Sequence, residues 1–310
     1  MAGLSARDIG LSVLVALIWG MGFVVAKGGM AHFPPILLMA LRFSITALAL
    51  VWFLGPVGRN MGRLVLISVV GASVQYALTF TGVKGLGAGL SALVVQLEVP
   101  FLVLLGALLL CERPTADKWL GIAIAFAGVG LIAAQERFTG SLLPVALVMG
   151  GAFLWAFGQV LVRGLKDMTG LSVTAWTAVL ATPQLFLLSA LFETGQVEAI
   201  RTAGTAAWGA ALYLGLIMTT LGYFLWNSLI LRNEVGLVAP FLLLLPVFSV
   251  IGGVLFLGET LTLSRLAGGA VVLTGVELIT LSRPQAVRLR AGGTLRPGVT
   301  MNRNPDDTSR

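Results

Sequence analysis

Long apolar segments recur along the whole chain, and short polar or glycine- and proline-containing stretches separate them. A helix that crosses about 30 Å of hydrocarbon needs about 20 predominantly apolar residues, and each segment is close to that length. The pattern therefore predicts an all-α integral membrane protein with ten transmembrane helices. The predicted helices are residues 9–29, 35–54, 64–82, 87–110, 117–134, 142–162, 171–192, 206–231, 236–257 and 264–282.

The second half of the chain repeats the first. ALIWGMGFVVAKG at 16–28 aligns with AFLWAFGQVLVRG at 152–164, and the match resumes after a polar insertion near 193–205. The matched residues include Trp19 with Trp155, Lys27 with Arg163, Tyr76 with Tyr223, Gly106 with Gly253, and Glu112 with Glu259. Because each copy holds an odd number of spans, the second must enter the membrane from the opposite side. We predict two inverted five-helix repeats, residues 1–140 and 141–282, around a central cavity, which suits alternating access.

Composition and charge place the protein in a membrane and orient it. Charged residues make up only 11% of the chain and hydrophobic residues 57%, with a mean hydropathy of +0.98. Lys and Arg are in excess on the side that holds both chain ends, which predicts cytoplasmic N- and C-termini in the inner (plasma) membrane. The tail, residues 283–310, is basic and contains several Pro and Gly. This composition favours a disordered segment at an anionic membrane surface over a folded nucleic-acid binder.

Residues that hold metals or carry out covalent catalysis are scarce. The single cysteine, Cys111, excludes an internal disulfide, and a single histidine, His32, argues against a His/Cys metal site. GLGAG at 85–89 lacks the third glycine of the dinucleotide-binding pattern and links two predicted helices. The sequence contains no phosphate-loop, zinc-protease or Ser/His/Asp pattern. We therefore expect no cofactor, no metal site and no enzymatic activity.

Two charged residues are predicted near the middle of the membrane. Glu98 lies at the centre of the predicted helix 87–110, and Arg42 lies at comparable depth in 35–54. A charged side chain there costs about 2.5 to 3.5 kcal/mol on insertion scales and normally faces a cavity or a partner. The two residues either form a fixed pair that joins their helices or bind the charged groups of a zwitterion. The sequence leaves both interpretations open, and it also leaves open whether protons drive transport.

Proline residues interrupt two predicted helices at corresponding positions of the two repeats. Pro100 lies in 87–110, whereas Pro240 and Pro246 lie in its repeat mate, 236–257. Each proline removes one backbone hydrogen bond and kinks its helix. Interrupted helices at matching positions are typical of transporter binding sites, so we predict conformational hinges here. Kinks that serve packing alone would give the same pattern.

Amide and aromatic side chains form a polar layer within the predicted helices. Trp and Tyr often mark membrane interfaces, but Trp19 and Trp155 match in the repeat and lie several residues inside their helices. Such side chains bind a ligand without adding net charge, although each could instead serve packing. Together with the two charged residues, the predicted substrate-binding set is Trp19, Arg42, Gln75, Tyr76, Gln96, Glu98, Trp155, Gln159, Tyr223 and Asn227.

Small residues line one face of two further predicted helices. In lipid, such residues let helix backbones approach closely. We interpret these faces as packing surfaces, either within the chain or at the interface of a homodimer. The residues are Gly121, Ala125 and Gly128 in 117–134, and Gly268, Gly269 and Gly275 in 264–282.

Several stretches together resemble a known family. They are the Trp- and Gly-containing first helix, PPILLMALRF at 34–43, PVFSVIGGVLFLGETL at 246–261 and GGAVVLTGVELI at 268–279. With the repeated LLLCERPT and LFLGETLT, they resemble the drug/metabolite transporter superfamily and, within it, EamA-type permeases, over residues 9–282. The resemblance is closest to bacterial exporters of amino acids and relatives, including O-acetylserine/cysteine and aromatic amino acid exporters. It implies ten helices in a basket around a central cavity and export from the cytoplasm.

These observations predict an inner-membrane exporter of amino acids or related small metabolites that works by alternating access. The expected partners are a zwitterionic amino acid and the lipid bilayer, with no nucleic acid. A nucleotide-sugar carrier would need several basic residues in the cavity, and only Arg42 is visible in the sequence. The sequence also fits a multidrug carrier or a membrane scaffold that transports nothing.

Overall fold

The part of the chain that can be described is entirely helical. A computed structural model describes residues 4–110, 112, 114–139, 142–165, 168–233, 235–260 and 262–281, and every regular element in these ranges is a helix. Nine of the described segments are long and apolar enough to cross a membrane, as expected for a multi-pass membrane protein. The predicted basic tail, 283–310, and Cys111 lie outside the described residues.

The helices follow the predicted spans closely. Four spans are single helices: α1 (Ala6–Gly29), α7 (Ala116–Thr139), α8 (Leu143–Val162) and α9 (Gly170–Phe192). A fifth is α2 (Pro35–Leu50), which continues as the short turn η1 (Val51–Phe53). The tenth predicted span coincides with α15 (Leu263–Leu281), which is not among the nine segments. The count of ten transmembrane helices therefore stays a prediction.

Four spans are interrupted, in two pairs that match between the halves. In the first pair a π-helical turn separates two α-helices. These elements are α3 (Met61–Ser68), η3 (Val69–Val74) and α4 (Gln75–Leu86), and then α11 (Thr205–Leu212), η4 (Tyr213–Leu221) and α12 (Gly222–Arg232). In the second pair the helix breaks. These elements are α5 (Ala88–Val95) and α6 (Glu98–Leu109), and then α13 (Val235–Val238), η5 (Ala239–Leu243) and α14 (Leu244–Leu257).

The predicted prolines lie at the broken pair of helices. Pro100 is the third residue of α6, and Pro246 is the third residue of α14, while Pro240 lies in η5. A proline fits the first turn of a helix because the N–H it lacks has no intrahelical partner there. The interruptions thus lie where the prolines predict them, whereas the hinge motion itself stays a prediction.

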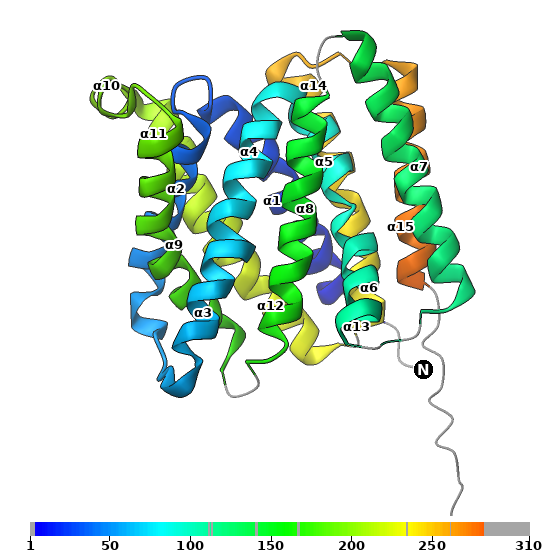
Figure 1. Ribbon diagram of the computed structural model, residues 1–310, viewed down its shortest axis with the longest axis horizontal. Helices are drawn as coiled ribbons and strands as arrows, with labels where there is room; N and C mark the ends of the chain where they lie inside the picture. The colour runs from blue at the N-terminus through cyan, green and yellow to red at the C-terminus, as the bar shows by residue number, and fades with distance from the viewer. Residues whose placement is uncertain are drawn as a thin grey trace, which may run out of the picture.

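The halves of the chain pack against each other through pairs of helices (Figure 1). α1 packs against α14, α4 against α8, and α2 against α9. At one edge of the bundle, α7 and α15 lie side by side.

The predicted small-residue faces meet between α7 and α15. A Cβ added to Gly275 would lie 2.5 Å from the Ala125 N atom, and one on Gly128 would lie 2.6 Å from Val272 N. Any larger residue at these glycines would push the two backbones apart. This contact, the glycine seam, uses the small residues within one chain, and a homodimer stays a prediction.

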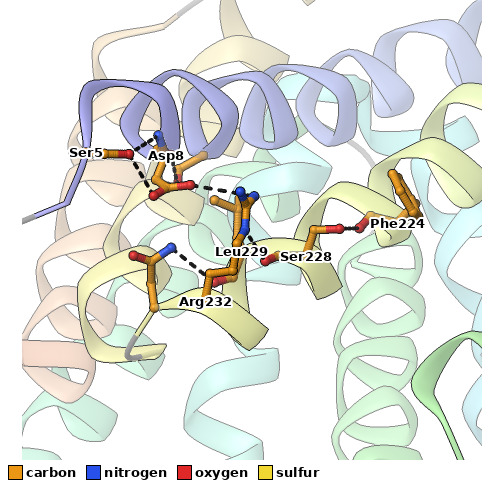
Figure 2. A network of polar contacts seen from close by, with 8 residues as sticks. Ser5, Asp8, Phe224, Ser228, Leu229 and Arg232 are labelled. Carbon is orange, nitrogen blue, oxygen red and sulfur yellow. Dashed lines mark hydrogen bonds and ion pairs between the residues drawn. The ribbon is translucent and has the colours of Figure 1, made fainter.

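A polar network ties α1 to α12 at the face of the bundle where the chain begins (Figure 2). Ser5 Oγ caps α1 by accepting the Asp8 N–H at 3.1 Å and donates to Asp8 Oδ2 at 2.7 Å. The other carboxylate oxygen, Oδ1, lies 3.6 Å from Arg232 Nη2 near the end of α12. Arg232 Nε also donates to the Ser228 carbonyl at 2.9 Å. The first turn of α1 is thereby joined to the last turn of α12.

Candidate functional site

A central cavity of about 280 Å³ lies where the interrupted helices meet. Its wall combines side chains from α1, α2, α4, α6, α8 and α12 with residues of α5, η4, η5 and α14. Eight of the ten predicted substrate-binding residues line this cavity: Trp19, Arg42, Gln75, Tyr76, Glu98, Trp155, Gln159 and Tyr223. The structure thus brings together residues that are far apart in the sequence.

The two remaining predicted residues are placed differently. Gln96 lies at the break between α5 and α6, where its N–H bonds to the Leu93 carbonyl at 3.2 Å, and it does not line the cavity. Asn227 belongs to α12, and its side chain lies outside the described part of the structure.

The cavity continues toward the face where the chain begins. An adjoining cavity of about 360 Å³ shares five lining residues with the central one: Tyr76, Trp155, Gln159, Tyr223 and Trp226. Its other walls include Ile67 in α3 and Val162 at the end of α8. In Figure 1 these helix ends lie on the same side as the N-terminus. In this conformation the site therefore extends toward that face.

Arg42 is fully buried at the cavity and is held by neutral groups. Its side chain is 1% exposed, its Nε donates to Thr219 Oγ1 at 2.9 Å, and its Nη2 donates to Tyr76 O–H at 3.3 Å. The guanidinium lies 4.6 Å from the centre of the Tyr76 ring, within range of a cation–π contact. Among the described residues the ion pairs are Arg163 with Glu112 and Arg232 with Asp8. Arg42 therefore does not form the fixed pair with Glu98 that the sequence left open.

Glu98 is the carboxylate of the same cavity. It lies in the first turn of α6, is partly buried, and its side chain has no hydrogen-bond partner within the described residues. Gln75 supplies a second acceptor, because its Nε2 donates to Thr79 Oγ1 at 3.0 Å while its buried Oε1 receives no hydrogen bond from the described part of the chain. A buried acceptor without a donor costs about 1 to 3 kcal/mol. The cavity thus holds a cation and a carboxylate that do not pair with each other.

The two matched tryptophans differ in how firmly they are held. Trp19 Nε1 donates to the Met218 carbonyl in η4 at 3.0 Å, and its ring lies 5.4 Å from the Tyr223 ring. Trp155 has no such hydrogen bond within the described residues, and it lines both cavities. The Trp19 ring is therefore held by a hydrogen bond, whereas the Trp155 ring is held by packing beside Leu105, Ala156 and Val160.

Several residues of the cavity wall are apolar and were not predicted. Phe23 and Phe80 stack with ring centres 6.1 Å apart, and Met218, Leu245 and Trp226 also line the cavity. In a sequence where most residues are apolar, such side chains cannot be distinguished from those that face lipid. Trp226 alone had a possible indication, since it precedes the predicted Asn227.

Metal-ligand clusters do not occur in the described part of the chain. No group of three or more His, Cys, Asp and Glu side chains that could hold an ion is found there. The chemistry of the cavity is therefore that of one guanidinium, one carboxylate, amides, hydroxyls and aromatic rings.

Comparison with known proteins gives a consistent result. The model of the EamA-like transporter family matches the chain twice, over residues 7–134 and 142–281. A Salmonella typhimurium protein named "Probable amino-acid metabolite efflux pump" is 34% identical over 290 residues, which cover 89% of this chain and 95% of the relative. A Streptantibioticus cattleyicolor protein named "Probable terminal-alkyne amino-acid exporter" is 30% identical over 278 residues, with coverages of 86% and 91%.

A solved crystal structure shares the fold. It superposes with a TM-score of 0.64 at 20% identity and covers 93% of this chain and 99% of the other. At this identity the likeness concerns the fold alone. The family match and the names of the relatives indicate a multi-pass membrane transporter rather than an enzyme.

Proposed function

The chain belongs to the EamA-like transporter family, and from this premise we propose that it exports amino acids or related small metabolites across the inner membrane. The observation that carries this proposal is the central cavity with its separate charges. Arg42 and Glu98 line one cavity, and neither has an oppositely charged partner among the described residues. Charged groups inside a membrane protein normally serve a substrate or ion path when they do not pair with each other.

In the proposed complex, each end of a zwitterion binds to a different helix. The Arg42 guanidinium binds the substrate carboxylate, because three of its five N–H groups bond to protein atoms and two remain. Glu98 accepts the substrate ammonium. The rings of Trp19, Tyr76 and Trp155 enclose the remainder of the substrate and add no net charge. A neutral amino acid thus satisfies both charges of the site at once.

The transport cycle that we propose is alternating access between two inverted five-helix repeats, with both chain ends in the cytoplasm. The matched π-helical turns, η3 and η4, support this proposal, as do the matched breaks of α5–α6 and α13–α14. Related interruptions in two halves give a bundle two conformations of similar energy, each open to one side. The opening toward the face of the N-terminus would then correspond to loading from the cytoplasm.

The composition of the cavity separates this proposal from three competing functions. A nucleotide-sugar carrier needs several cations for its phosphates, and Arg42 is the one cationic residue among the described lining residues. A multidrug carrier for organic cations would use Glu98 but would leave Arg42 without a function. A scaffold without transport gives no reason for two unpaired charges beside a cavity.

Counterflow into liposomes tests the proposal. Purified protein is reconstituted into vesicles loaded with one unlabelled amino acid, and uptake of labelled amino acids is followed, together with an organic cation and a nucleotide sugar. Neutral amino acids are expected to exchange. The Glu198→Gln variant, on the surface helix α10 (Gln196–Arg201), serves as the control for reconstitution and should exchange equally well. Folded protein that exchanges no amino acid contradicts the proposal, and exchange of the cation or the sugar supports the corresponding carrier function.

A further inference from the structure

A carboxylate that follows the end of α14 holds the start of α5. The Ala88 N–H and the Gly89 N–H, the latter at 3.1 Å, donate to the two carboxylate oxygens of Glu259. Gly87 makes this contact possible, because its φ is 96° and a Cβ there would lie 2.7 Å from Glu259 Oε1. The first N–H groups of a helix have no intrahelical partner and carry partial positive charge. The carboxylate therefore satisfies two of them and complements the helix dipole.

An ammonium from α1 holds the end of α4 at the same turn. Lys27 Nζ donates to the Val83 carbonyl at 3.0 Å and to the Lys84 carbonyl. These carbonyls belong to the last turn of α4, where positive charge is favourable. The turn between α4 and α5 is thus held from both sides, by a cation at the helix end and a carboxylate at the helix start. We call this set, Lys27 and Glu259 on the α4–α5 turn, the distal clasp.

The repeat mates of the clasp residues have the same local backbone but different partners. The Glu112 N–H bonds to the Gly106 carbonyl at 3.2 Å, just as the Glu259 N–H bonds to Gly253 at 3.1 Å. A Cβ on Gly106 would meet Glu112 Oε2 at 2.7 Å, and one on Gly253 would meet Glu259 Oε2 at 2.6 Å. Both glutamates therefore fold back onto the helix before them in the same way.

Beyond that shared backbone, the charges are paired differently at the two faces. Glu112 Oε1 forms a salt bridge with Arg163 Nη1 at 2.7 Å, and both side chains are about half exposed. Arg163 is the repeat mate of Lys27, so at this face the cation and the carboxylate bond to each other. At the opposite face Lys27 and Glu259 bond to the α4–α5 turn instead.

The two faces also differ in whether the central cavity reaches them. The central cavity extends toward the face of Arg163 and Glu112. The distal clasp lies at the other end, where Lys27, Gly87 and Glu259 line a separate cavity of about 370 Å³. The described lining of that cavity shares no residue with the central one. Lys27 and Glu259 thus hold the α4–α5 turn at the face that the central cavity does not reach. Their repeat mates, Arg163 and Glu112, bond to each other at the face toward which the cavity extends.

We propose that Lys27 and Glu259 are gating residues of the transport cycle, in addition to the substrate-binding ones. Lys27 and Glu259 hold the α4–α5 turn while the site is open to the face of the N-terminus. In the opposite conformation Lys27 releases the end of α4 and Glu259 releases the start of α5. The inference rests on the proposed alternating access, but it concerns which groups stabilise each conformation.

The accessibility of a single cysteine from each face of the membrane tests the gating role without any substrate. In a Cys111→Ser background, Leu245→Cys places a thiol on the cavity wall, and a membrane-impermeant thiol reagent is added from one face at a time. The parent is expected to react mainly from the face of the N-terminus. Glu259→Gln should raise the rate from the opposite face about tenfold, the effect of losing charge-assisted hydrogen bonds in one conformation. Glu112→Gln removes a half-exposed salt bridge at the other face and should change the sidedness much less.

A matched control is available on the same face. Glu193 also accepts two helix-start N–H groups, from Ile36 at 2.7 Å and Leu37 at 2.9 Å, but it lies in the insertion that has no counterpart in the first half. Glu193→Gln should therefore leave the sidedness unchanged. Unaltered labelling in folded Glu259→Gln, or equal changes in both variants, overturns the inference. If Glu259→Gln fails to fold, Lys27→Met decides, because it removes the cation from the end of α4 and must also raise the rate from the opposite face.

The outcome is independent of the substrate assignment. Protein that exchanges no amino acid but shows the predicted labelling would keep the clasp and remove the proposed function. Protein that exchanges amino acids but shows no change of sidedness would keep the proposed function and remove the clasp.

Discussion

The two halves of the molecule bring different charged and amide side chains to the central cavity but the same glutamate to a matched helix end. At the central cavity, Glu98 of the first half is matched by Leu245, and Gln159 of the second half is matched by Phe23, although all four line the same wall. At the helix ends, Glu112 and Glu259 remain identical and fold back onto matched glycines. The glutamate and the glycine that shape this helix end are thus the same in both halves. The binding chemistry differs, and it makes a symmetric framework bind one orientation of an asymmetric ligand.

The largest expected effect comes from the central cation. Arg42→Gln should lower amino acid counterflow about 100-fold, because the substrate carboxylate loses its partner in a buried site. Arg42→Lys should recover part of the activity, since an ammonium keeps the charge but lacks the planar fork. Initial rates in proteoliposomes with equal amounts of folded protein measure both. Equal rates for the glutamine variant and the parent would show that Arg42 serves packing alone.

The next largest effect is expected at Glu98, and its repeat mate, Leu245, provides the comparison. Glu98→Gln should lower the exchange of amino acids about tenfold while expression stays near normal, because only the carboxylate charge is lost. Leu245→Gln places the same amide on the matched side of the wall and serves as the comparison. It should change the substrate range more than the rate. A Glu98→Gln variant that does not fold would instead assign Glu98 a structural role.

A smaller effect separates the matched tryptophans. Trp19→Phe should lower the unfolding temperature in detergent, because the Met218 carbonyl loses a hydrogen bond worth about 1 kcal/mol. Trp155→Phe should leave that temperature nearly unchanged and raise the KM for large amino acids. If both variants change stability and KM alike, the different ways in which the Trp19 and Trp155 rings are held have no functional meaning.

The smallest effect is expected at the interrupted helices. Pro100→Ala should change stability by about 1 kcal/mol or less, because alanine also fits the first turn of α6. We expect it to slow exchange more than it lowers substrate affinity, as a change of hinge stiffness would. Paired measurements of rate and KM distinguish this result from a packing defect, which would lower the amount of folded protein.

The sequence predicts the framework well because its rules act locally. Lengths of apolar segments and polar breaks locate the helices, and charges such as Arg42 and Glu98 are conspicuous where nearly every neighbour is apolar. The π-helical turns η3 and η4 were not predicted, since VVGASV and YLGLIMTTL contain no proline and read as ordinary helix. The sequence also could not show which rotation brings Glu98 into the cavity and leaves Gln96 outside it. That choice depends on where the helix breaks before α6.

The glycine seam has a practical consequence for dissecting the molecule. It joins the last helix of each repeat, α7 and α15, by backbone contacts that only a matched pair of flat helix faces can make. Two separately synthesised pieces, divided between α7 and α8, would each carry one of these faces into the bilayer. Such pieces should recognise one another and reassemble, and a bulky residue in place of Gly275 should weaken that reassembly.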